Sequence, residues 1–525
     1  MPISLIQPLK AEHAEYLRDE SRTIGTAETI SFPQTEADVS AILKELYEEK
    51  IPVTVQGART GLAAAAVPKS GHIMNLSKMD RVLALRQGEG RFFLTVQPGV
   101  ALLNLRKLIS SCAFDTEGWS EESLAALESL RAAPEHFFPT DPTEATASIG
   151  GMTACNASGA RTYLYGPMRS HVTARRAVLT DGSTIVLRRG EHKAAGLSFT
   201  LPTEQGGLLQ GELPDMQMPA CKNTSGYFVQ RDMDLIDLFI GSDGTLAVVT
   251  AIELELLPLP PVIWGVTCFF REEEMAARFV EALRPALRNV ASLEYFDPNA
   301  LRILNRQKAS GGVFARLPDS GSESAAAVYA ELHCQSETEA LESLRILGEQ
   351  CAEAGGDPDR SWVGRTAFDK ETMTFFRHAV PESVNMLIDQ RKKTAPGITK
   401  LGSDMAVPDG KLLAVMELYH RTLAEEGFEY AIWGHIGNNH VHVNILPRDM
   451  EEYRRGKALF TGWAAQITAM GGAVSAEHGV GKLKAAFLPI MFGNEVMARM
   501  YRLKQVFDPY GQLGQGNLFA EEAAV

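Results

Sequence analysis

The run "LAVVTAIELELLPLPP", from Leu246 to Pro261, constrains the fold more than any other part of this chain. Its alternation of residue types, closed by prolines, is typical of a long β-strand that ends there. The residue pattern also differs on the two sides of this run. Because 525 residues are too many for a single hydrophobic core, the chain should divide into two or three domains. We place the first domain boundary at residue 261.

Residues 1–261 mix helices with short β-branched runs. "TEADVSAILKELYEEK" (35–50) has apolar residues at helical spacing and Thr35 as an N-cap. "IPVTVQG" (51–57) and "RFFLTVQPGV" (91–100) are typical of buried strands that stop at glycine. "ARRAVLTDGSTIVL" predicts a hairpin that turns at Asp181-Gly182.

Strand-like and helix-like segments alternate through residues 262–446. This order favours an α+β layer, an antiparallel sheet with helices on one face. Residues 447–525 are mostly helical in pattern, including "EEYRRGKALFTGWAAQITAMGG". The sequence therefore predicts an α+β protein with three parts.

Composition excludes several classes of function. A balance of 51 basic and 65 acidic residues disfavours a general nucleic-acid surface, so an anionic substrate would need locally placed cations. The six cysteines form no C-x-x-C pair, which argues against an iron–sulfur cluster or a zinc ribbon and fits a reducing cytoplasm. We expect no transmembrane segment and no signal peptide, because no run of 18 apolar residues and no basic-then-apolar start occur.

Two clusters of small residues are candidate ligand loops. They are "VTVQGARTGL" and "PTDPTEATASIGGMTACNASGARTYLYGPMRSHV" (139–172). Small residues free backbone N–H groups to bind anions, although the same residues also make ordinary turns. A dinucleotide G-x-G-x-x-G between a strand and a helix is missing, and so is a Walker loop. With "IGSDGTL" (240–246), the two clusters favour a large phosphate-bearing cofactor.

The densest group of histidines lies in "WGHIGNNHVHVNILP" (433–447). His440, His442 and Asn444 alternate and would share one face of a strand, and a hairpin would return His435 towards His442. Neutral imidazoles with one carboxylate suit a divalent ion such as zinc. Hydrogen-bonded core histidines are the alternative, and the stretch alone leaves both open. Glu477-His478, in "SAEHGVGK", is ambiguous in the same way.

Long strings of this chain, in order, resemble the vanillyl-alcohol-oxidase type of FAD oxidoreductase. They are "QGARTGL", "PTDPTEATASIGGMTACNASGARTYLYGP" and "FIGSDGTLAVVTAIELELLP". With the distal histidine motifs, the chain is similar to the subfamily of D-lactate dehydrogenase, D-2-hydroxyglutarate dehydrogenase and glycolate oxidase. The resemblance implies a two-part FAD-binding domain, an α+β substrate (cap) domain, and a helical C-terminal segment that completes the FAD and metal sites.

The resemblance implies which residues hold FAD. The first loop would cradle the pyrophosphate, the second would wrap the adenosine and flavin side, and "GSDGT" would lie near the adenine. Because the first loop has no histidine, we expect FAD to be bound non-covalently. The usual asparagine near the end is replaced by Gly514, for which Asn517 would compensate. The implied FAD-binding residues are Gly57, Arg59, Thr60, Gly61, Pro139, Thr140, Asp141, Thr146, Gly150, Gly151, Asn156, Ser158, Gly244, Thr245 and Asn517.

The resemblance also implies roles for polar residues outside the FAD-binding domain. His435, His442 and Glu477 fall on metal-ligand positions, with zinc the expected ion, and His478 falls on the catalytic base. Arg377 and Lys400 would bind the substrate carboxylate, with Arg377 better suited because its planar fork binds carboxylates bidentately. His440 stands where the subfamily usually has asparagine, so it is either an extra polar contact or another ligand.

The implied activity is oxidation of a D-2-hydroxy acid to the 2-oxo acid. Electrons would then leave through a separate acceptor: an electron-transfer flavoprotein, a cytochrome, a quinone or an iron–sulfur subunit. We expect a cytoplasmic protein, free or held at the inner face of the membrane by a partner, and we also consider a homodimer. Three alternatives stay open: a metal-free flavin oxidase, a catalytically dead FAD-binding subunit, and an enzyme like alkyl-dihydroxyacetone-phosphate synthase.

Overall fold

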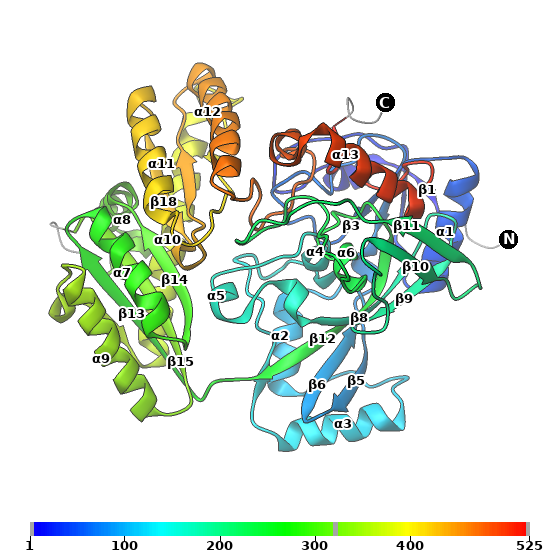
Figure 1. The fold of residues 1–525 in the computed structure, drawn as a ribbon, viewed down its shortest axis with the longest axis horizontal. Coiled ribbons are helices and arrows are strands. Elements are labelled where there is room, and N and C mark those ends of the chain that lie inside the picture. Colours follow the sequence, from blue (N-terminus) through cyan, green and yellow to red (C-terminus); the bar gives the residue numbers. More distant parts are fainter. Residues whose placement is uncertain (1–4, 319–323, 521–525) are drawn as a thin grey trace.

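The computed structural model describes residues 5–318 and 324–520 (Figure 1). The predicted boundary strand is β12 (Val248–Pro258), and β13 (Val262–Phe270) follows it directly. In Figure 1, β12 belongs to one sheet and β13 begins another, to one side of the first. Among the described residues, no helix combines the length and the apolar character needed to cross a membrane.

The first sheet has four strands in the order β1-β2-β4-β3, with β4 parallel to both β2 and β3. The helix predicted after Thr35 forms as α1 (Glu36–Glu48), and Thr35 and Asp38 make a reciprocal capping box. Its apolar face, including Val39 and Leu43, packs on β3 and β4 and on Val248 of β12, so the first two sheets share a core. The four strands are β1 (Gln7–Pro8), β2 (Thr29–Ser31), β3 (Val53–Gln56) and β4 (His72–Asn75).

The second sheet is antiparallel and runs β5-β6-β12-β8-β9, with β7 paired to β12 beside it. The predicted hairpin at Asp181-Gly182 is confirmed as β8 and β9. A separate hairpin consists of β10 (Ser198–Pro202) and β11 (Leu208–Glu212). The other strands are β5 (Val82–Gly88), β6 (Arg91–Val96), β7 (His136–Phe137), β8 (Val172–Val178) and β9 (Thr184–Arg188). The helices of this half are α2 (Leu102–Ser111), α3 (Glu121–Ala132), α4 (Ile149–Ala154), α5 (Thr162–Tyr165) and α6 (Ile236–Phe239).

The third sheet has seven antiparallel strands in the order β16-β13-β15-β14-β18-β19-β17. The predicted antiparallel α+β layer is therefore confirmed. Its remaining strands are β14 (Val290–Phe296), β15 (Ala326–Cys334), β16 (Trp362–Gly364), β17 (Leu401–Gly402), β18 (Tyr430–Gly434) and β19 (His442–Ile445). Its helices are α7 (Glu273–Ala286), α8 (Pro298–Ser310), α9 (Glu337–Glu353), α10 (Ala367–Arg391) and α11 (Leu412–Glu426).

The expectation of helices on only one face of this sheet is wrong. All nine residues of β15 are buried, so both faces of this strand need a cover. Ala327 and Tyr329 pack in a core with α8 and α10, while Val328 and Ala330 lie in a second core with α7, α9 and α11.

The C-terminal part returns to the first sheet. It contains α12 (Met450–Ala469) and α13 (Leu488–Phe507), as the helical pattern predicted. After α13, the backbone of Gln512 accepts a hydrogen bond from Val53 of β3, and Gly514 donates one back to Val53. The two ends of the chain therefore build one unit (Figure 1). The exact division at residues 261 and 446 stays a prediction.

Candidate active site

One cavity brings together the three segments that the sequence indicated as ligand loops. Its wall includes residues 55–63, 142–144, 147–148, 150–155, 157–159 and 242–244. His435, Glu477 and His478 close one part of the same wall. The predicted FAD-binding residues that line it are Gly57, Arg59, Thr60, Gly61, Gly150, Gly151, Ser158 and Gly244.

Two glycines of this wall, Gly57 and Gly150, are required by close approach. A Cβ on Gly57 would lie 2.1 Å from Ser148 Oγ, and one on Gly150 would lie 2.5 Å from Pro98 Cβ. Ser148 caps α4 and accepts a 3.3 Å hydrogen bond from the backbone N–H of Ala58, which ties the two loops together. At Gly61 and Gly244, in contrast, a Cβ would meet no protein atom within 4 Å. The loops therefore leave narrow, backbone-lined space of the kind that a dinucleotide cofactor fills.

Other predicted FAD-binding residues lie behind the wall and brace it. Asn156 accepts a hydrogen bond from the backbone N–H of Arg169, and the Thr245 hydroxyl donates to the carbonyl of Ser242. Asn517 donates to the carbonyls of Ala65 and Asp243 and accepts from Lys482 at 2.7 Å. Asn517 thus joins the first loop, the "GSDGT" loop and the C-terminal segment.

The remaining four lie in the segment that leads to α4 and do not line the cavity. Pro139 and Thr140 are buried, and the Thr140 hydroxyl has no hydrogen-bond partner. Thr146 is exposed and donates to Glu144. Asp141 accepts from the backbone N–H of Arg161 at 3.0 Å, and burial raises the pKa of this carboxyl.

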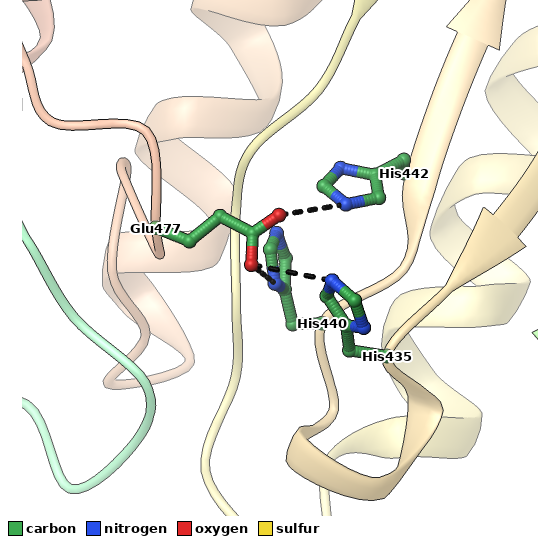
Figure 2. Close-up of side chains that lie close together, drawn as sticks. All are labelled: His435, His440, His442 and Glu477. Carbon is green, nitrogen blue, oxygen red and sulfur yellow. Dashed lines mark ion pairs between the residues drawn. The ribbon is translucent and has the colours of Figure 1, made fainter. Parts of the chain in front are cut away.

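Three histidines and one glutamate converge next to this cavity (Figure 2). β18 ends at Gly434, a short turn reverses the chain, and β19 begins at His442, so the predicted hairpin does return His435 to His442. Glu477 lies between them, with Oε2 3.2 Å from His435 Nε2 and Oε1 3.1 Å from His442 Nε2. His440 lies in the turn before β19 and still faces the cluster, with Nδ1 3.8 Å from Glu477 Oε2.

Hydrogen bonds orient the two outer histidines. His435 Nδ1 lies 2.7 Å from Glu294 Oε1, and His442 Nδ1 lies 3.1 Å from the carbonyl oxygen of Ser403. Against burial, Glu294 and Glu477 raise the pKa of His435 to about 9, so its ring would give up the Nε2 proton on binding a metal. The two Nδ1 partners would then keep each Nε2 directed at the cluster as the donor atom. Two Nε2 atoms and one carboxylate form a donor set that suits zinc or a similar divalent ion. These residues therefore fit a metal.

His440 has a different environment. It is fully buried, and neither ring nitrogen makes a hydrogen bond of normal geometry, although Nε2 lies 3.1 Å from Asp404 Oδ1. Burial holds the pKa of His440 well below its ordinary value, so its ring is neutral. The sequence left its role open. The structure brings His440 within reach of the same cluster as His435, His442 and Glu477.

Asp404 fixes the peptide that carries Glu477 and His478. Its two oxygens accept the backbone N–H groups of both residues at 3.1 Å, and Oδ2 lies 3.5 Å from His478 Nδ1. Lys484 pairs with the same oxygen. Although burial opposes ionisation, the charge of Lys484 holds the pKa of Asp404 well below its ordinary value.

His478 faces the cavity with a neutral ring. Burial lowers the pKa of His478 to about 4, against the pull of Asp404 and Glu477. Its Nε2 lies 3.3 Å from Glu477 Oε1. Its side chain is 32% exposed because it lies on the wall of the cavity. A neutral imidazole on a cavity wall can accept a proton from a bound molecule.

Lys222 supplies a cation that the sequence did not indicate. Its ammonium group pairs with Glu477 and is only 4% exposed. Ser158 donates to the same oxygen of Glu477 at 3.3 Å. Burial opposes ionisation of Glu477, but Lys222 and His435 together hold the pKa of this carboxyl well below its ordinary value. Glu477 is therefore a carboxylate with both oxygens directed at cationic or metal-binding partners.

Of the two predicted substrate cations, the structure brings one beside Glu294, which contacts His435 of the cluster. Arg377, on α10, has Nη2 3.9 Å from Glu294 Oε2, and its guanidinium makes no hydrogen bond within the described part of the chain. Lys400 precedes β17 and contacts no member of the cluster among the described residues. Burial, helped by the charge of Arg22, lowers the pKa of Lys400.

Sequence reasoning missed Lys222 and Glu294 and gave Asp404 no role. Glu294 carried a weak signal, because an acidic residue inside the buried strand "VASLEYF" needs a partner. Nothing in the sequence distinguishes Lys222 from a surface lysine. Both reach the cluster from segments distant in sequence.

The fold and the site define a FAD-dependent oxidoreductase. The profile described as "FAD linked oxidases, C-terminal domain" matches residues 259–518, and that described as "FAD binding domain" matches residues 27–113 and 122–188. The chain belongs to the FAD-linked oxidase family, which confirms the resemblance drawn from its motifs. It is an enzyme whose cofactor is FAD.

The similar proteins have related names. A D-lactate dehydrogenase of Anaerostipes hadrus is 28% identical over 518 residues, covering 96% of this chain and 92% of its own length. A D-2-hydroxyglutarate dehydrogenase of Stutzerimonas stutzeri is 25% identical, covering 94% and 90%. A solved alkyldihydroxyacetonephosphate synthase aligns with a TM-score of 0.64 and 12% identity, over 98% of this chain and 82% of its own, and shows a shared fold only.

Proposed function

We propose that this protein oxidises a D-2-hydroxy acid, such as D-lactate or D-2-hydroxyglutarate, or the achiral glycolate, to the 2-oxo acid. The observation that carries the proposal is the position of His435, Glu477 and His478 on the wall of the FAD cavity. The names of the similar proteins support the same substrate class. When bound, FAD accepts a hydride from the substrate carbon.

His435, His442 and Glu477 would hold a divalent ion, most consistently zinc, with His440 as a further candidate ligand. Such an ion would supply Lewis-acid chemistry, binding the hydroxyl and a carboxylate oxygen of the substrate and lowering the hydroxyl pKa. Glu294 and Ser403 keep the ring orientations of His435 and His442 fixed. The metal-binding side chains would thus be oriented before the ion binds.

His478 would accept the hydroxyl proton at Nε2. Its ring is neutral at physiological pH, it opens into the cavity, and Asp404 holds its backbone and faces its Nδ1. These features suit a general base, which must be within reach of the proton and unprotonated. Because Asp404 also holds Glu477, the base and the metal ligand would keep a constant separation.

Arg377 would bind the substrate carboxylate. Its guanidinium is near the cluster, carries no hydrogen bond to the described residues, and has the fork geometry that a carboxylate matches. Lys400 is the less supported of the two cations, because only Arg377 lies beside a residue that touches the cluster.

Reduced flavin must pass its electrons to an acceptor before the next turnover. The six cysteines are free, and the sequence has no C-x-x-C pair that would bind an iron–sulfur cluster. We therefore propose a separate acceptor: an electron-transfer flavoprotein, a cytochrome, a quinone or an iron–sulfur subunit.

Anaerobic bleaching of the bound flavin tests this proposal. The holoprotein is mixed with D- and L-2-hydroxy acids, with and without a strong chelator, and absorbance near the flavin maximum is followed. We expect bleaching by D acids only, loss of bleaching with chelator, and no bleaching in His442→Ala or His478→Gln at unchanged flavin content. A flavin that no hydroxy acid reduces would point instead to a non-catalytic FAD-binding subunit and refute the proposal.

A further inference from the structure

Arg175, in the middle of β8, is a buried cation without a counterion. Its side chain is 5% exposed, and its Nε and Nη1 atoms have no hydrogen-bond partner. Within residues 5–318 and 324–520, no ion pair reaches its guanidinium, whose Cζ lies 5.2 Å from the ring centre of Phe239. A buried charge is costly when unpaired, so a residue of this kind indicates a partner that is not protein.

Neighbouring arginines show the usual behaviour. Arg176, on the opposite face of the same strand, pairs with Glu36 at 2.7 Å and with Glu204 at 2.8 Å. Arg189 lies 2.9 Å from Asp237. The protein thus gives Arg176 and Arg189 carboxylate partners and, within the described residues, leaves Arg175 without one.

Arg175 lines the FAD cavity beside Phe239, Ala247 and Val249. Burial alone lowers the pKa of Arg175 to about 9, with no contribution from any charged side chain. Within the described residues, Arg175 makes no ion pair with any member of the histidine cluster.

We propose that Arg175 binds the ADP half of FAD, donating hydrogen bonds to acceptor atoms of the pyrophosphate or the adenine ring. The proposed function, on which this placement rests, puts the reacting substrate at His478 and therefore the flavin end of FAD near that residue, whereas Arg175 makes no ion pair with His478 or with the rest of the cluster. A guanidinium is suited to this task because its planar set of donors matches phosphate oxygens and because it loses less than an ammonium on leaving water.

Three variants test the assignment. Arg175→Met removes the donors at similar volume, Arg175→Lys keeps the charge without the fork, and Arg176→Met is the matched control on the other face of β8. FAD per chain is measured after gel filtration, and the Kd for FAD is measured by titrating the flavin-free full-length protein. We expect Arg175→Met to raise the Kd about 10- to 100-fold, Arg175→Lys to raise it less, and Arg176→Met to leave it unchanged.

Two further measurements separate cofactor binding from a structural role. FMN lacks the adenylate, so its Kd should be the same in the parent and in Arg175→Met. The thermal midpoint of the flavin-free Arg175→Met protein should rise, because the variant no longer buries an unpaired charge, while its stabilisation by FAD should shrink. Competition by ADP and by adenosine then distinguishes the partner: weaker competition by ADP alone indicates the phosphates, and weaker competition by both indicates the adenine.

Unchanged FAD content and Kd in Arg175→Met would overturn the proposal. Equal losses of FAD and FMN affinity, or a lower thermal midpoint of the flavin-free variant, would also overturn it, because each would mean that Arg175 supports the fold. FAD binding is measured without substrate, so a failure to oxidise hydroxy acids leaves these results intact.

Discussion

Glu294 offers a direct test of how the histidine cluster is organised. This carboxylate is buried on β14, and its Oε1 lies 2.7 Å from His435 Nδ1. We consider Glu294→Gln, which keeps the size and a hydrogen-bond acceptor but removes the negative charge. The prediction is that the variant still folds and binds FAD but loses metal affinity.

The magnitude follows from what Glu294 does for His435. The negative charge makes the ring a better donor to a metal and holds Nε2 towards Glu477, 3.2 Å away. Outer-shell partners of ligating histidines typically change metal affinity about 10- to 100-fold when mutated. At about 1.4 kcal/mol for each factor of ten, we expect a loss of about 1.4–2.7 kcal/mol in metal-binding free energy. The affinity for substrate should also fall, since Nη2 of Arg377, the proposed carboxylate-binding residue, lies 3.9 Å from Glu294 Oε2.

The assay is competition for zinc between the FAD-loaded protein and a chromophoric chelator of known affinity. Glu273→Gln is the matched control. Glu273 forms a similar pair with a histidine in the same domain, 3.0 Å from His420 Nε2, but lies outside the cluster. Flavin absorbance per chain reports whether each variant is intact.

The reasoning would be refuted if Glu294→Gln bound zinc as tightly as the parent protein. It would fail equally if Glu273→Gln lost as much affinity, because the loss would then reflect domain stability. A variant that lost FAD together with the metal would show that Glu294 supports the fold.

Two further predictions concern the FAD-binding half. Gly57→Ala places a Cβ 2.1 Å from Ser148 Oγ, so overpacking should cost roughly 1–3 kcal/mol of FAD-binding free energy. Adding Ser148→Ala should restore part of that loss. The control is Gly462→Ala, whose Cβ meets no atom within 4 Å and which should leave the amount of FAD bound per chain unchanged. Burial lowers the pKa of His72 to about 4, and its ring contacts Thr29 and Ser31 hydroxyls. The unfolded chain takes up this proton near pH 6.5, so the free energy of unfolding should fall by up to about 3 kcal/mol as pH drops from 6.5 to 4. Urea denaturation should show a flatter pH profile for His72→Gln, and an identical profile would contradict the prediction.

Local signals let the sequence specify many elements of the fold. The N-cap at Thr35, the turn at Asp181-Gly182 and the alternation in Val248–Pro258 each depend on residues close together in the chain. The long glycine-rich strings allowed the family and the cofactor to be inferred. Some of these glycines answer a close contact, as Gly57 does against Ser148.

Tertiary structure decided how the two faces of the third sheet are covered. Small residues such as Ala327 and Ala330 are compatible with one covered face or two, so the strand pattern did not settle the number of helix layers. Only the packing of α8 and α10 on one face and α7 and α9 on the other answers this question.

The sequence by itself determined that His435, His442 and Glu477-His478 are the candidate chemical groups, because the motifs that carry them resemble those of a known family in residue type and order. Only the tertiary structure decided which partners they have. Lys222, Glu294 and Asp404 reach the cluster from positions 73 to 255 residues away from their partners, and Arg175 is seen to be unpaired only once its surroundings are known. The physical reason is that burial, charge pairing and pKa depend on distances in space, which a linear order of residues does not fix.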